Sequence, residues 1–409
     1  MKICIISNLY PPFVRGGAEI IAAMEAEGLK KAWQHVFAIS SRPRVIKIHG
    51  QSVANKVGFF SVSRDEVNEV DVRRFAPMNL YYYLDDFKYP VFIRLLWHFF
   101  DIFNIFSYFT IRKVLKEEKP DVVISHNLMG IGFLIPSLIR RLKIKHVHTL
   151  HDIQLVTPSG LIVKGKENSL EHKFFKAIGY VKIMRWLMGS PDIVISPSKF
   201  LLDFYQQNKF FSKSKKLVVA NPIKNLIKIK KQSSPKLELL FLGQVHKAKG
   251  VLELIKNFKK IKLPHLKLHI VGVGQDLATA KELAGDDKRI KFYGWLPHSH
   301  VIPLLSKIDV VLVPSLCYEN SPSVIYESLG MGIPVLAADI GGTAELIKEG
   351  HNGWIFPAGD FEVFNKKIVS LYKQREKIAP MAANCQASVS KYLLDNYIKK
   401  VLELIQQGE

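Results

Sequence analysis

Apolar runs of strand length recur along the chain, and each is followed by a loop that carries polar or glycine residues. Such runs begin at Lys2, Val122, Val147, Leu266 and Ile333. Short, fully apolar strands of this kind are typical of parallel sheets whose two faces are covered by helices. The pattern predicts the α/β class, and 409 residues are enough for two domains that each bury a core.

The segment from Val313 to Ala344 has the most informative pattern. One apolar run ends at Pro314, and a loop follows it. Ser321 is a typical N-cap and Pro322 a typical first helical residue, so a short helix is expected to begin there. This helix should end near Gly330, where the next apolar strand follows at once.

The start of this helix is predicted to hold a phosphate. The N–H groups of Ser323 and Val324 have no acceptor within the helix, and in strand–loop–helix–strand units ligands lie beyond the carboxyl ends of the strands. Glu319 precedes the helix, and Glu327 follows Val324 by about one turn on the same face. Carboxylates repel a diphosphate, so they should accept hydrogen bonds from sugar hydroxyls. A nucleotide-sugar fits this arrangement, although two arbitrary glutamates are more often solvated surface charges.

The residues E-N-S-P-S-V-I-Y-E, followed by G-x-G-x-P-V and G-G-x-x-E, resemble the signature of family-4 glycosyltransferases. This resemblance implies the GT-B fold, in which two Rossmann-like domains face each other across a cleft, and sugar transfer with retention of configuration. It also implies that Glu319 contacts the donor sugar hydroxyls and that Glu327 holds the ribose of the nucleotide.

The stretch Leu239–Gly250 is similar to the diphosphate clamp of the same family, G-R-x-x-x-K-G. The resemblance implies that Lys249 neutralises the departing diphosphate, a charge-assisted contact of about 1.5–3 kcal/mol. Gln244 stands where the family has arginine, and it offers an N–H donor without the charge or the two-pronged geometry. Either Lys249 and backbone amides suffice, or another cation such as Lys247 or Arg15 contributes.

Motifs in the first half of the chain extend the resemblance. Gly16 and Gly17 lie in N-L-Y-P-P-F-V-R-G-G-A-E, which resembles the opening motif whose loop covers the donor phosphate. His151, in T-L-H-D, matches the histidine that contacts the donor sugar near the reacting carbon. His126 and Asp152 are expected in the cleft as well.

Gly274 and Tyr293 belong to further matching motifs and are expected on the donor side. The resulting expectation is a catalytic set and a donor-binding set: His151, Glu319 and Lys249; and Gly16, Gly17, Gln244, Gly274, Tyr293, Ser321, Pro322, Ser323, Val324 and Glu327. A nicotinamide cofactor is disfavoured, because Leu277 replaces the third glycine of a dinucleotide fingerprint. The resemblance implies metal-independent chemistry without a cofactor.

The domain boundary is expected near 225–236, a basic stretch that contains serine and proline. This gives an acceptor-side domain (1–224) and a nucleotide-sugar domain (225–386). The remaining segment, 387–409, is expected to contain a helix, Ala387–Gln407, and the family resemblance implies that this helix packs back on the first domain. The three cysteines have no metal or disulfide spacing, and no secretory signal precedes the first strand, so a cytoplasmic protein is expected.

The net charge is +22, of which residues 1–224 contribute +15. No nucleic-acid-binding motif accompanies this charge, so an anionic membrane surface on the cytoplasmic side is the better candidate. The aromatic segment Tyr81–Phe109 has charges at helical spacing on one side and is too polar to span a bilayer. Its aromatic residues either pack the domain core or face a membrane.

These observations predict a peripheral, retaining hexosyltransferase that uses a UDP- or GDP-sugar and a glycan or lipid-linked acceptor in cell-surface polysaccharide assembly. Two alternatives remain at this stage. One is a non-catalytic nucleotide-sugar-binding partner in a glycan-assembly complex, for which Gln244 would be a symptom. The other is a GT-B sugar-nucleotide epimerase.

Overall fold

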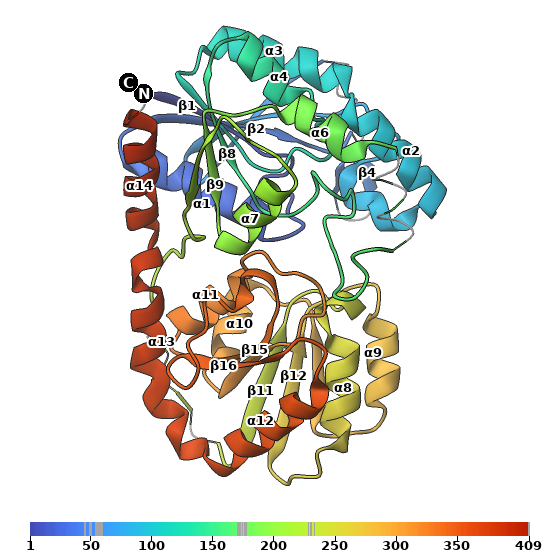
Figure 1. The fold of residues 1–409 in the computed structure, drawn as a ribbon, viewed down its shortest axis with the longest axis vertical. Coiled ribbons are helices and arrows are strands. Elements are labelled where there is room, and N and C mark those ends of the chain that lie inside the picture. The colour runs from blue at the N-terminus through green and yellow to red at the C-terminus, as the bar shows by residue number, and fades with distance from the viewer. Residues whose placement is uncertain are drawn as a thin grey trace. The chain divides into compact units, whose positions relative to one another are not determined.

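The computed structural model describes residues 1–44, 46–48, 51–53, 60–169, 173, 175, 178–227, 229, 231–232 and 234–407. Two compact units make up the chain (Figure 1). Unit 1 comprises Met1–Gly160, Leu170–Pro222 and Leu394–Glu409, and unit 2 comprises Leu161–Ser169 and Ile223–Leu393. Three residues of the predicted boundary stretch, 228, 230 and 233, lie outside the described residues.

Unit 1 is built on an eight-stranded sheet in the order β10-β9-β8-β7-β1-β2-β6-β5, parallel except for the edge pair β5–β6. The strands are β1 (Lys2–Ile6), β2 (His35–Ser41), β5 (Ser63–Val67), β6 (Val70–Phe75), β7 (Val122–Ser125), β8 (Lys145–Thr149), β9 (Ile193–Ser196) and β10 (Lys215–Val218), with a separate hairpin of β3 (Ile46–Ile48) and β4 (Gln51–Val53). The helices are α1 (Gly17–Lys31), α2 (Val91–Ile102), α3 (Ile105–Glu118), α4 (Ile135–Arg141), α6 (Tyr180–Met188), α7 (Lys199–Gln207) and α14 (Leu394–Gln406), with the 3₁₀ helix η1 (Tyr83–Lys88).

Helices cover both faces of this sheet. Ile3 and Ile5 of β1 lie in one apolar cluster with residues of α1 and α14, and the glycine at position 28 lets these two helices approach closely. A Cβ there would lie 2.5 Å from Cγ1 of Ile398. Figure 1 shows α3 and α4 on the other side of the sheet. Because successive side chains of β1 point to opposite faces, the strand packs against a layer of helices on each face, as expected for a doubly wound sheet.

Unit 2 is built on a six-stranded, fully parallel sheet in the order β13-β12-β11-β14-β15-β16. The strands are β11 (Leu237–Leu242), β12 (Leu266–Val271), β13 (Ile290–Gly294), β14 (Val310–Val313), β15 (Val335–Asp339) and β16 (Gly353–Pro357). The helices are α8 (Val251–Lys260), α9 (Leu277–Ala284), α10 (His298–Leu305), α11 (Ser323–Gly330), α12 (Phe361–Lys373) and α13 (Ala382–Val389), with the 3₁₀ helices η2 (Lys247–Lys249), η3 (Gly341–Thr343), η4 (Arg375–Lys377), η5 (Ala379–Met381) and η6 (Ser390–Tyr392).

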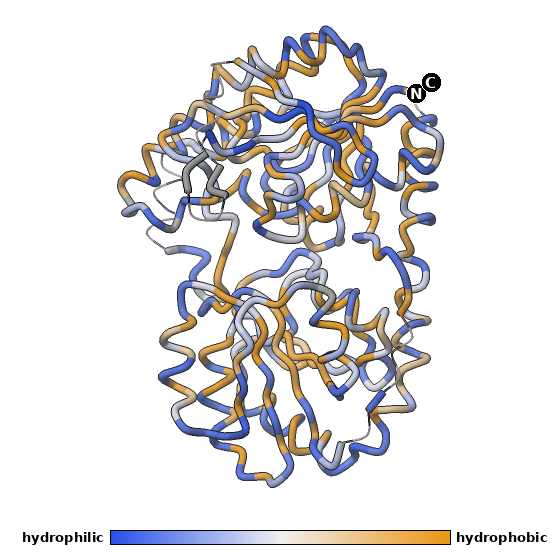
Figure 2. The backbone as a smooth tube through the Cα atoms, turned by 180° about the vertical axis from the view of Figure 1, so that it is seen from behind, coloured by the Kyte–Doolittle hydropathy of each residue, from blue (hydrophilic) through white to orange (hydrophobic). Residues whose placement is uncertain are grey.

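The core of unit 2 follows from two sequence periods. β14 is apolar on both faces, and so is β11 except at Glu238, whereas α8 buries Val251, Leu254, Ile255 and Phe258 at helical spacing. The hydrophobic colour of Figure 2 accordingly runs along the central strands. These residues join strands and helices in one cluster, which fixes the strand ends that carry the loops described below.

Two predicted helix boundaries are wrong. The helix after Glu319 begins at Ser323, with Pro322 rather than Ser321 as its N-cap, and the Ser321 hydroxyl instead lies 2.7 Å from that of Tyr326. The predicted helix Ala387–Gln407 is interrupted, since α13 ends at Val389, η6 follows, and α14 starts at Leu394. A tertiary hydrogen bond accompanies the interruption: the Tyr392 carbonyl accepts the N–H of Ile223 at 2.9 Å.

The unit boundaries also differ in detail from the predicted 1–224, 225–386 and 387–409. The chain changes unit at Pro222–Ile223 and at Leu393–Leu394. In addition, residues 161–169 belong to unit 2, which no sequence feature indicated. Backbone hydrogen bonds explain this: Lys164 N–H donates to the Leu316 carbonyl, and Tyr318 N–H donates to that of Ile162, both at 2.9 Å.

Candidate active site

Each sheet has the strand order 3-2-1-4-5-6 of a Rossmann fold, in β6-β2-β1-β7-β8-β9 and in β13-β12-β11-β14-β15-β16. In such sheets the order of strands reverses next to the first strand, and the loops that leave this point diverge and open a crevice. The switch points lie between β1 and β7 in unit 1 and between β11 and β14 in unit 2. Most predicted site residues follow these strands.

In unit 2 the structure brings Lys249 and Glu319 together. Lys249 ends η2, in the loop after β11, and Glu319 lies in the loop after β14. The Lys249 Nζ is 2.7 Å from Oε1 of Glu319, and the side chains are only 29% and 11% exposed. A cation and a carboxylate 70 residues apart in sequence thus form one ion pair at the switch point.

The Glu319 loop is held from both sides. Its Oε1 also accepts a hydrogen bond from the Ser315 hydroxyl at 2.6 Å. Its backbone carbonyl accepts the N–H of Gly342 at 2.7 Å, and a Cβ on Gly341 would lie 2.1 Å from the same carbonyl oxygen. Glu319 therefore has little freedom to move, as expected of a preorganised binding group.

The two loops of the switch point are also joined through their backbones. The Ala248 carbonyl accepts the N–H groups of Leu316 and Cys317 at 2.9 and 3.1 Å. Gly250 has φ +75°, and a Cβ there would lie 1.8 Å from the Pro314 carbonyl oxygen. Gly274 is equally close to its neighbours, since a Cβ there would lie 2.3 Å from the Val245 carbonyl oxygen.

The charges in unit 2 fit an anionic, hydroxyl-bearing ligand. Desolvation lowers the pKa of Lys249, but the adjacent Glu319 carboxylate outweighs it and holds this pKa above its ordinary value. Lys249 is therefore a permanent cation at neutral pH. The Glu327 side chain on α11 is accessible to solvent. The protein around its carboxyl group nevertheless displaces part of the hydrating water, and this desolvation raises the pKa of Glu327. Ser323 and Val324 supply amides of the first turn of α11.

Gln244 and Tyr293, two further predicted donor-binding residues, have different surroundings. Gln244 is exposed in the loop after β11 and adds no charge beside Lys249. The Tyr293 hydroxyl lies 2.8 Å from Nδ1 of His269, whose Nε2 lies 2.7 Å from Oε2 of Glu238. His269 is within β12 and Glu238 is the second residue of β11, so this chain runs away from the carboxyl ends of the strands. Only the backbone of Tyr293 stays near that edge.

In unit 1 the structure brings His126 and His151 together at the ends of β7 and β8. His126 Nδ1 and His151 Nε2 are 2.8 Å apart, and the rings are stacked with centroids at 5.1 Å. On its other side, His126 Nε2 lies 3.3 Å from Oε2 of Glu25, which accepts a hydrogen bond from the Tyr397 hydroxyl at 3.2 Å. Desolvation, followed by the proximity of His126, lowers the pKa of His151 well below its ordinary value.

Glu25 was missed by the sequence analysis. It lies on the face of α1 that also carries Ile21, Ala22 and Leu29, and both Glu25 and His126 are fully buried. A carboxylate in an apolar helix stripe is the signal that could have found it, because buried charges require a partner. Glu25 thus positions His126, and through it the half-buried His151.

The other predicted residues of unit 1 lie at the same edge of the sheet. Gly16 is the N-cap of α1, and its N–H donates to Oε2 of Glu19 at 2.8 Å, so a carboxylate already occupies the start of the helix that Gly17 begins. Oδ1 of Asp152 accepts the N–H of Gln154 at 2.9 Å, and burial raises the pKa of Asp152 to about 6.

Among the described residues, no group of three or more histidine, cysteine, aspartate or glutamate side chains has a geometry that could hold a metal ion. In the same part of the chain no helix is both long and apolar enough to cross a bilayer. The site residues available for binding are therefore cations, carboxylates, imidazoles and helix-start amides.

Comparisons with protein families give two matches. Residues 15–224, about half of the chain, match the family described as Glycosyltransferase Family 4, and residues 223–387 match the family described as Glycosyl transferases group 1. An uncharacterized 42.6 kDa protein in the cps region of Klebsiella pneumoniae is 24% identical over 85% of this chain and 87% of its own length. The amylovoran biosynthesis glycosyltransferase AmsK of Erwinia amylovora is 24% identical over 41% of this chain and 44% of its own.

Solved structures share the fold over the full length. Sucrose-phosphate synthase from Thermosynechococcus elongatus superimposes with a TM-score of 0.75, at 16% identity over 99% of this chain and 98% of that one. HepE of Anabaena, solved in complex with UDP-glucose, superimposes with a TM-score of 0.70, at 17% identity over the whole of both chains. At these identities the likeness establishes the fold, which is GT-B with a Rossmann-like sheet in each unit.

Proposed function

The chain belongs to glycosyltransferase family 4, and on that premise we propose that it transfers a hexosyl group, with retention of configuration, from a UDP- or GDP-sugar to a glycan or lipid-linked acceptor. The reaction serves the assembly of a cell-surface polysaccharide. One observation carries the proposal: the ion pair of Lys249 and Glu319 at the switch point of unit 2.

This pair fits the bond that a nucleotide-sugar donor presents. The hydroxyls of a sugar and the phosphate on its anomeric carbon lie a few bonds apart, so their binding groups must be neighbours as well. Lys249 is a cation suited to the phosphate, and Glu319 is a carboxylate suited to hydroxyls, with its position fixed by Ser315 and Gly342. Glu327, on the exposed side of α11, is suited to the ribose hydroxyls.

The proposed chemistry requires neither a metal nor a cofactor. Lys249 and the amides of Ser323 and Val324 stabilise the charge that develops on the leaving diphosphate. No side chain is assigned as a covalent nucleophile, so the acceptor attacks from the face that the diphosphate leaves. His151, held by His126 and Glu25, is proposed to contact the donor sugar near the reacting carbon.

The donor and the pathway are supported by relatives. HepE was solved with UDP-glucose, which favours a UDP-sugar among the possible donors. AmsK is named for amylovoran biosynthesis, and the Klebsiella relative is encoded in a cps region. These names point to polysaccharide assembly rather than to a sugar-nucleotide epimerase.

A stereochemical assay tests the transfer reaction. With UDP-glucose, UDP-galactose and GDP-mannose offered in turn with polyprenyl-linked saccharides, we expect one donor to react and the anomeric configuration to be retained in the product, as read by NMR. Chelation with EDTA should leave the rate unchanged. Inversion, or dependence on a divalent cation, would contradict the mechanism, and donor binding without any transfer would favour the non-catalytic partner.

We also propose peripheral attachment to a membrane through α2. The side of this helix that carries Arg94, Trp97 and Asp101 faces inward. Trp97 and Asp101 are 1% exposed, and Arg94 pairs with Asp86 at 3.0 Å. Its outward side is apolar, and the exposed side chains are Phe92, Leu95, Leu96, Phe99 and Phe100, with Phe103 just after the helix. Tyr81 and Trp97 thus pack the core, whereas most aromatic residues of the segment face outward.

An exposed apolar helix face in a strongly basic unit fits an anionic lipid surface, which attracts the charge and buries the apolar side chains. Replacing both Phe92 and Phe99, which are 63% and 62% exposed, by serine should weaken binding to phosphatidylglycerol vesicles about tenfold or more. The melting temperature should not change, because neither side chain is in the core. Sedimentation with vesicles at several salt concentrations measures both the apolar and the electrostatic part.

Trp33 provides the matched control, since it is 94% exposed but lies before β2, away from α2. Trp33→Ser should bind vesicles as the wild type does. Equal vesicle binding by the phenylalanine double variant and the wild type would remove α2 from the proposal.

A further inference from the structure

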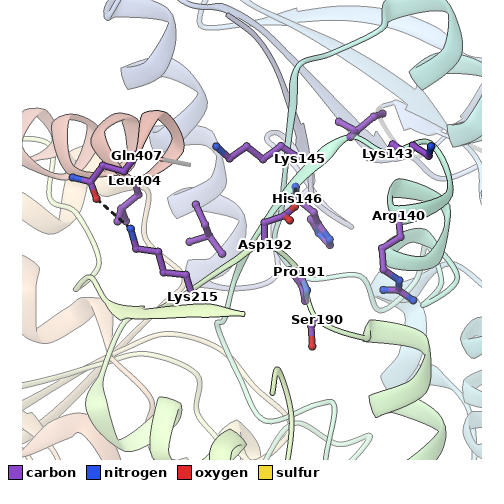
Figure 3. A pocket seen from close by; sticks show the side chains of 12 residues that line it. Arg140, Lys143, Lys145, His146, Ser190, Pro191, Asp192, Lys215, Leu404 and Gln407 are labelled. Atoms are coloured by element: carbon purple, nitrogen blue, oxygen red, sulfur yellow. Dashed lines mark hydrogen bonds between the residues drawn. The ribbon is translucent and has the colours of Figure 1, made fainter. Parts of the chain in front are cut away.

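Unit 1 contains a second concave site, at the edge of the sheet opposite His126 and His151. A pocket of about 660 Å³ lies at the amino ends of β8, β9 and β10, where Lys145, Ile193 and Lys215 are the first residues of the strands (Figure 3). Leu404, in the last turn of α14, and Gln407, directly after this helix, complete the wall. Because His126 and His151 follow the carboxyl ends of the strands, this pocket is separate from the candidate active site.

Cationic side chains outnumber carboxylates around the pocket by four to one. Arg140, Lys143, Lys145 and Lys215 line it, and Asp192 is the acidic residue among its lining groups. Within the described residues none of the four cations forms an ion pair. Their recorded partners are neutral: Arg140 donates to the backbone carbonyl of Leu187, Lys145 to that of Ile405, and Lys215 to the side-chain oxygen of Gln407 at 3.2 Å.

His146, the second residue of β8, is a further lining residue of this pocket. This residue is 1% exposed. Its Nε2 lies 2.7 Å from the Ser125 hydroxyl, whereas its buried Nδ1 has no hydrogen-bond partner in the described part of the chain. Successive strand residues point to opposite faces of a sheet, so the His146 ring lies on the face opposite the Lys145 side chain, beside Ser125.

We propose that this pocket binds a phosphate-bearing ligand. The ammonium groups of Lys143, Lys145 and Lys215 contact the phosphate oxygens. The pocket is larger than a single phosphate and lies within the range of small-molecule sites. Ser190 and the Asp192 carboxylate are placed to accept hydrogen bonds from hydroxyls, so a polyol attached to the phosphate fits the remaining space.

Two kinds of ligand combine a phosphate with hydroxyl groups in this way: a dissolved sugar phosphate and the phosphoglycerol headgroup of an anionic lipid. In either case the ligand lies beside the end of α14, because Lys145 contacts the Ile405 carbonyl and Lys215 contacts Gln407. Figure 3 shows the second of these contacts. Binding should therefore slow amide hydrogen exchange in the last turns of α14 as well as at the start of β8. The inference is independent of the transfer reaction and of the donor site.

Calorimetric titration at constant ionic strength tests the proposal with glucose 6-phosphate as the dissolved probe and phosphatidylglycerol vesicles as the lipid probe. The variant is Lys143→Gln/Lys215→Gln, which changes two exposed side chains and leaves the core intact. The matched control is Lys113→Gln/Lys199→Gln, which removes the same charge from exposed positions of α3 and α7. Lys145→Gln provides a second pocket variant, on the strand itself.

We expect the dissociation constant of one probe to rise at least tenfold in both pocket variants and to stay within twofold of the wild type in the control. Loss of glucose 6-phosphate binding identifies a dissolved ligand, and selective loss of vesicle binding identifies a headgroup. Equal effects of pocket and control variants would overturn the proposal, as would a wild type that binds neither probe. Binding of glucose 6-phosphate that depends on Lys249 instead of these residues would assign it to the donor site and overturn it too.

Discussion

Replacing Lys249 with alanine is expected to lower kcat/KM for sugar transfer by two orders of magnitude or more. This change removes the cation that the structure places beside Glu319 at the switch point of unit 2. Deleting a group that stabilises charge developing in the transition state raises the activation free energy by about 2.7–4 kcal/mol. Initial rates at donor concentrations below KM measure the loss directly.

The ion pair adds an effect on stability that the sequence did not indicate. Without Lys249, the Glu319 carboxylate keeps the hydrogen bond from Ser315 but loses its counter-ion in a largely buried place. We therefore expect Lys249→Ala to lower the free energy of unfolding by about 1–3 kcal/mol. Adding Glu319→Gln should restore stability without restoring activity, because the neutral amide no longer needs the cation.

Lys256 offers a matched control. Its Nζ is also 2.7 Å from a glutamate carboxylate, that of Glu253, but this pair is exposed on α8. Lys256→Ala should change neither activity nor stability measurably, as is usual for surface ion pairs. A Lys249→Ala variant that turned over within threefold of the wild type would show that Lys249 does not contact the diphosphate.

Much of the fold could be predicted because the strands of both sheets are short and apolar. β1 and β12 begin at the predicted residues, Lys2 and Leu266, and the GT-B fold follows from motifs that lie at the ends of such strands. The errors occur where tertiary hydrogen bonds override a local pattern. Ile223 donates to the Tyr392 carbonyl where the predicted last helix is interrupted, and residues 161–169 join unit 2 through Leu316 and Tyr318.

The candidate site was predictable where a motif names the residue and not where packing selects it. Lys249 and Glu319 were expected in one site, and the structure adds that they are directly paired. Ser315, which fixes Glu319, and Glu25, which positions His126, belong to no motif. Tyr293 does belong to a motif, but the sequence does not indicate that its hydroxyl lies 2.8 Å from Nδ1 of His269. Side-chain direction depends on neighbours that a linear pattern does not contain.

The glycine at position 250 explains why the Lys249 loop has the sequence Lys-Gly, and it supports the second large prediction. Its backbone is left-handed, with φ +75°, and its Cα faces the carbonyl of Pro314 so closely that a Cβ would lie 1.8 Å from that oxygen. A left-handed alanine costs about 1–2 kcal/mol, and forcing two backbones apart adds about 1–3 kcal/mol. Gly250→Ala should therefore destabilise unit 2 by about 3 kcal/mol or more.

Gly350 separates these two contributions, because it has nearly the same φ, +70°, and open space around the position of a Cβ. Gly350→Ala should lose only the conformational part, about 1–2 kcal/mol, whereas Gly250→Ala should lower the melting temperature of unit 2 by about 6–12 °C in calorimetry. Activity should fall in Gly250→Ala even well below its melting temperature, because moving Pro314 away from position 250 shifts Glu319 relative to Lys249. Equal melting temperatures for the two variants would show that the loops after β11 and β14 separate without cost, and the preorganisation assigned to this ion pair would then be wrong.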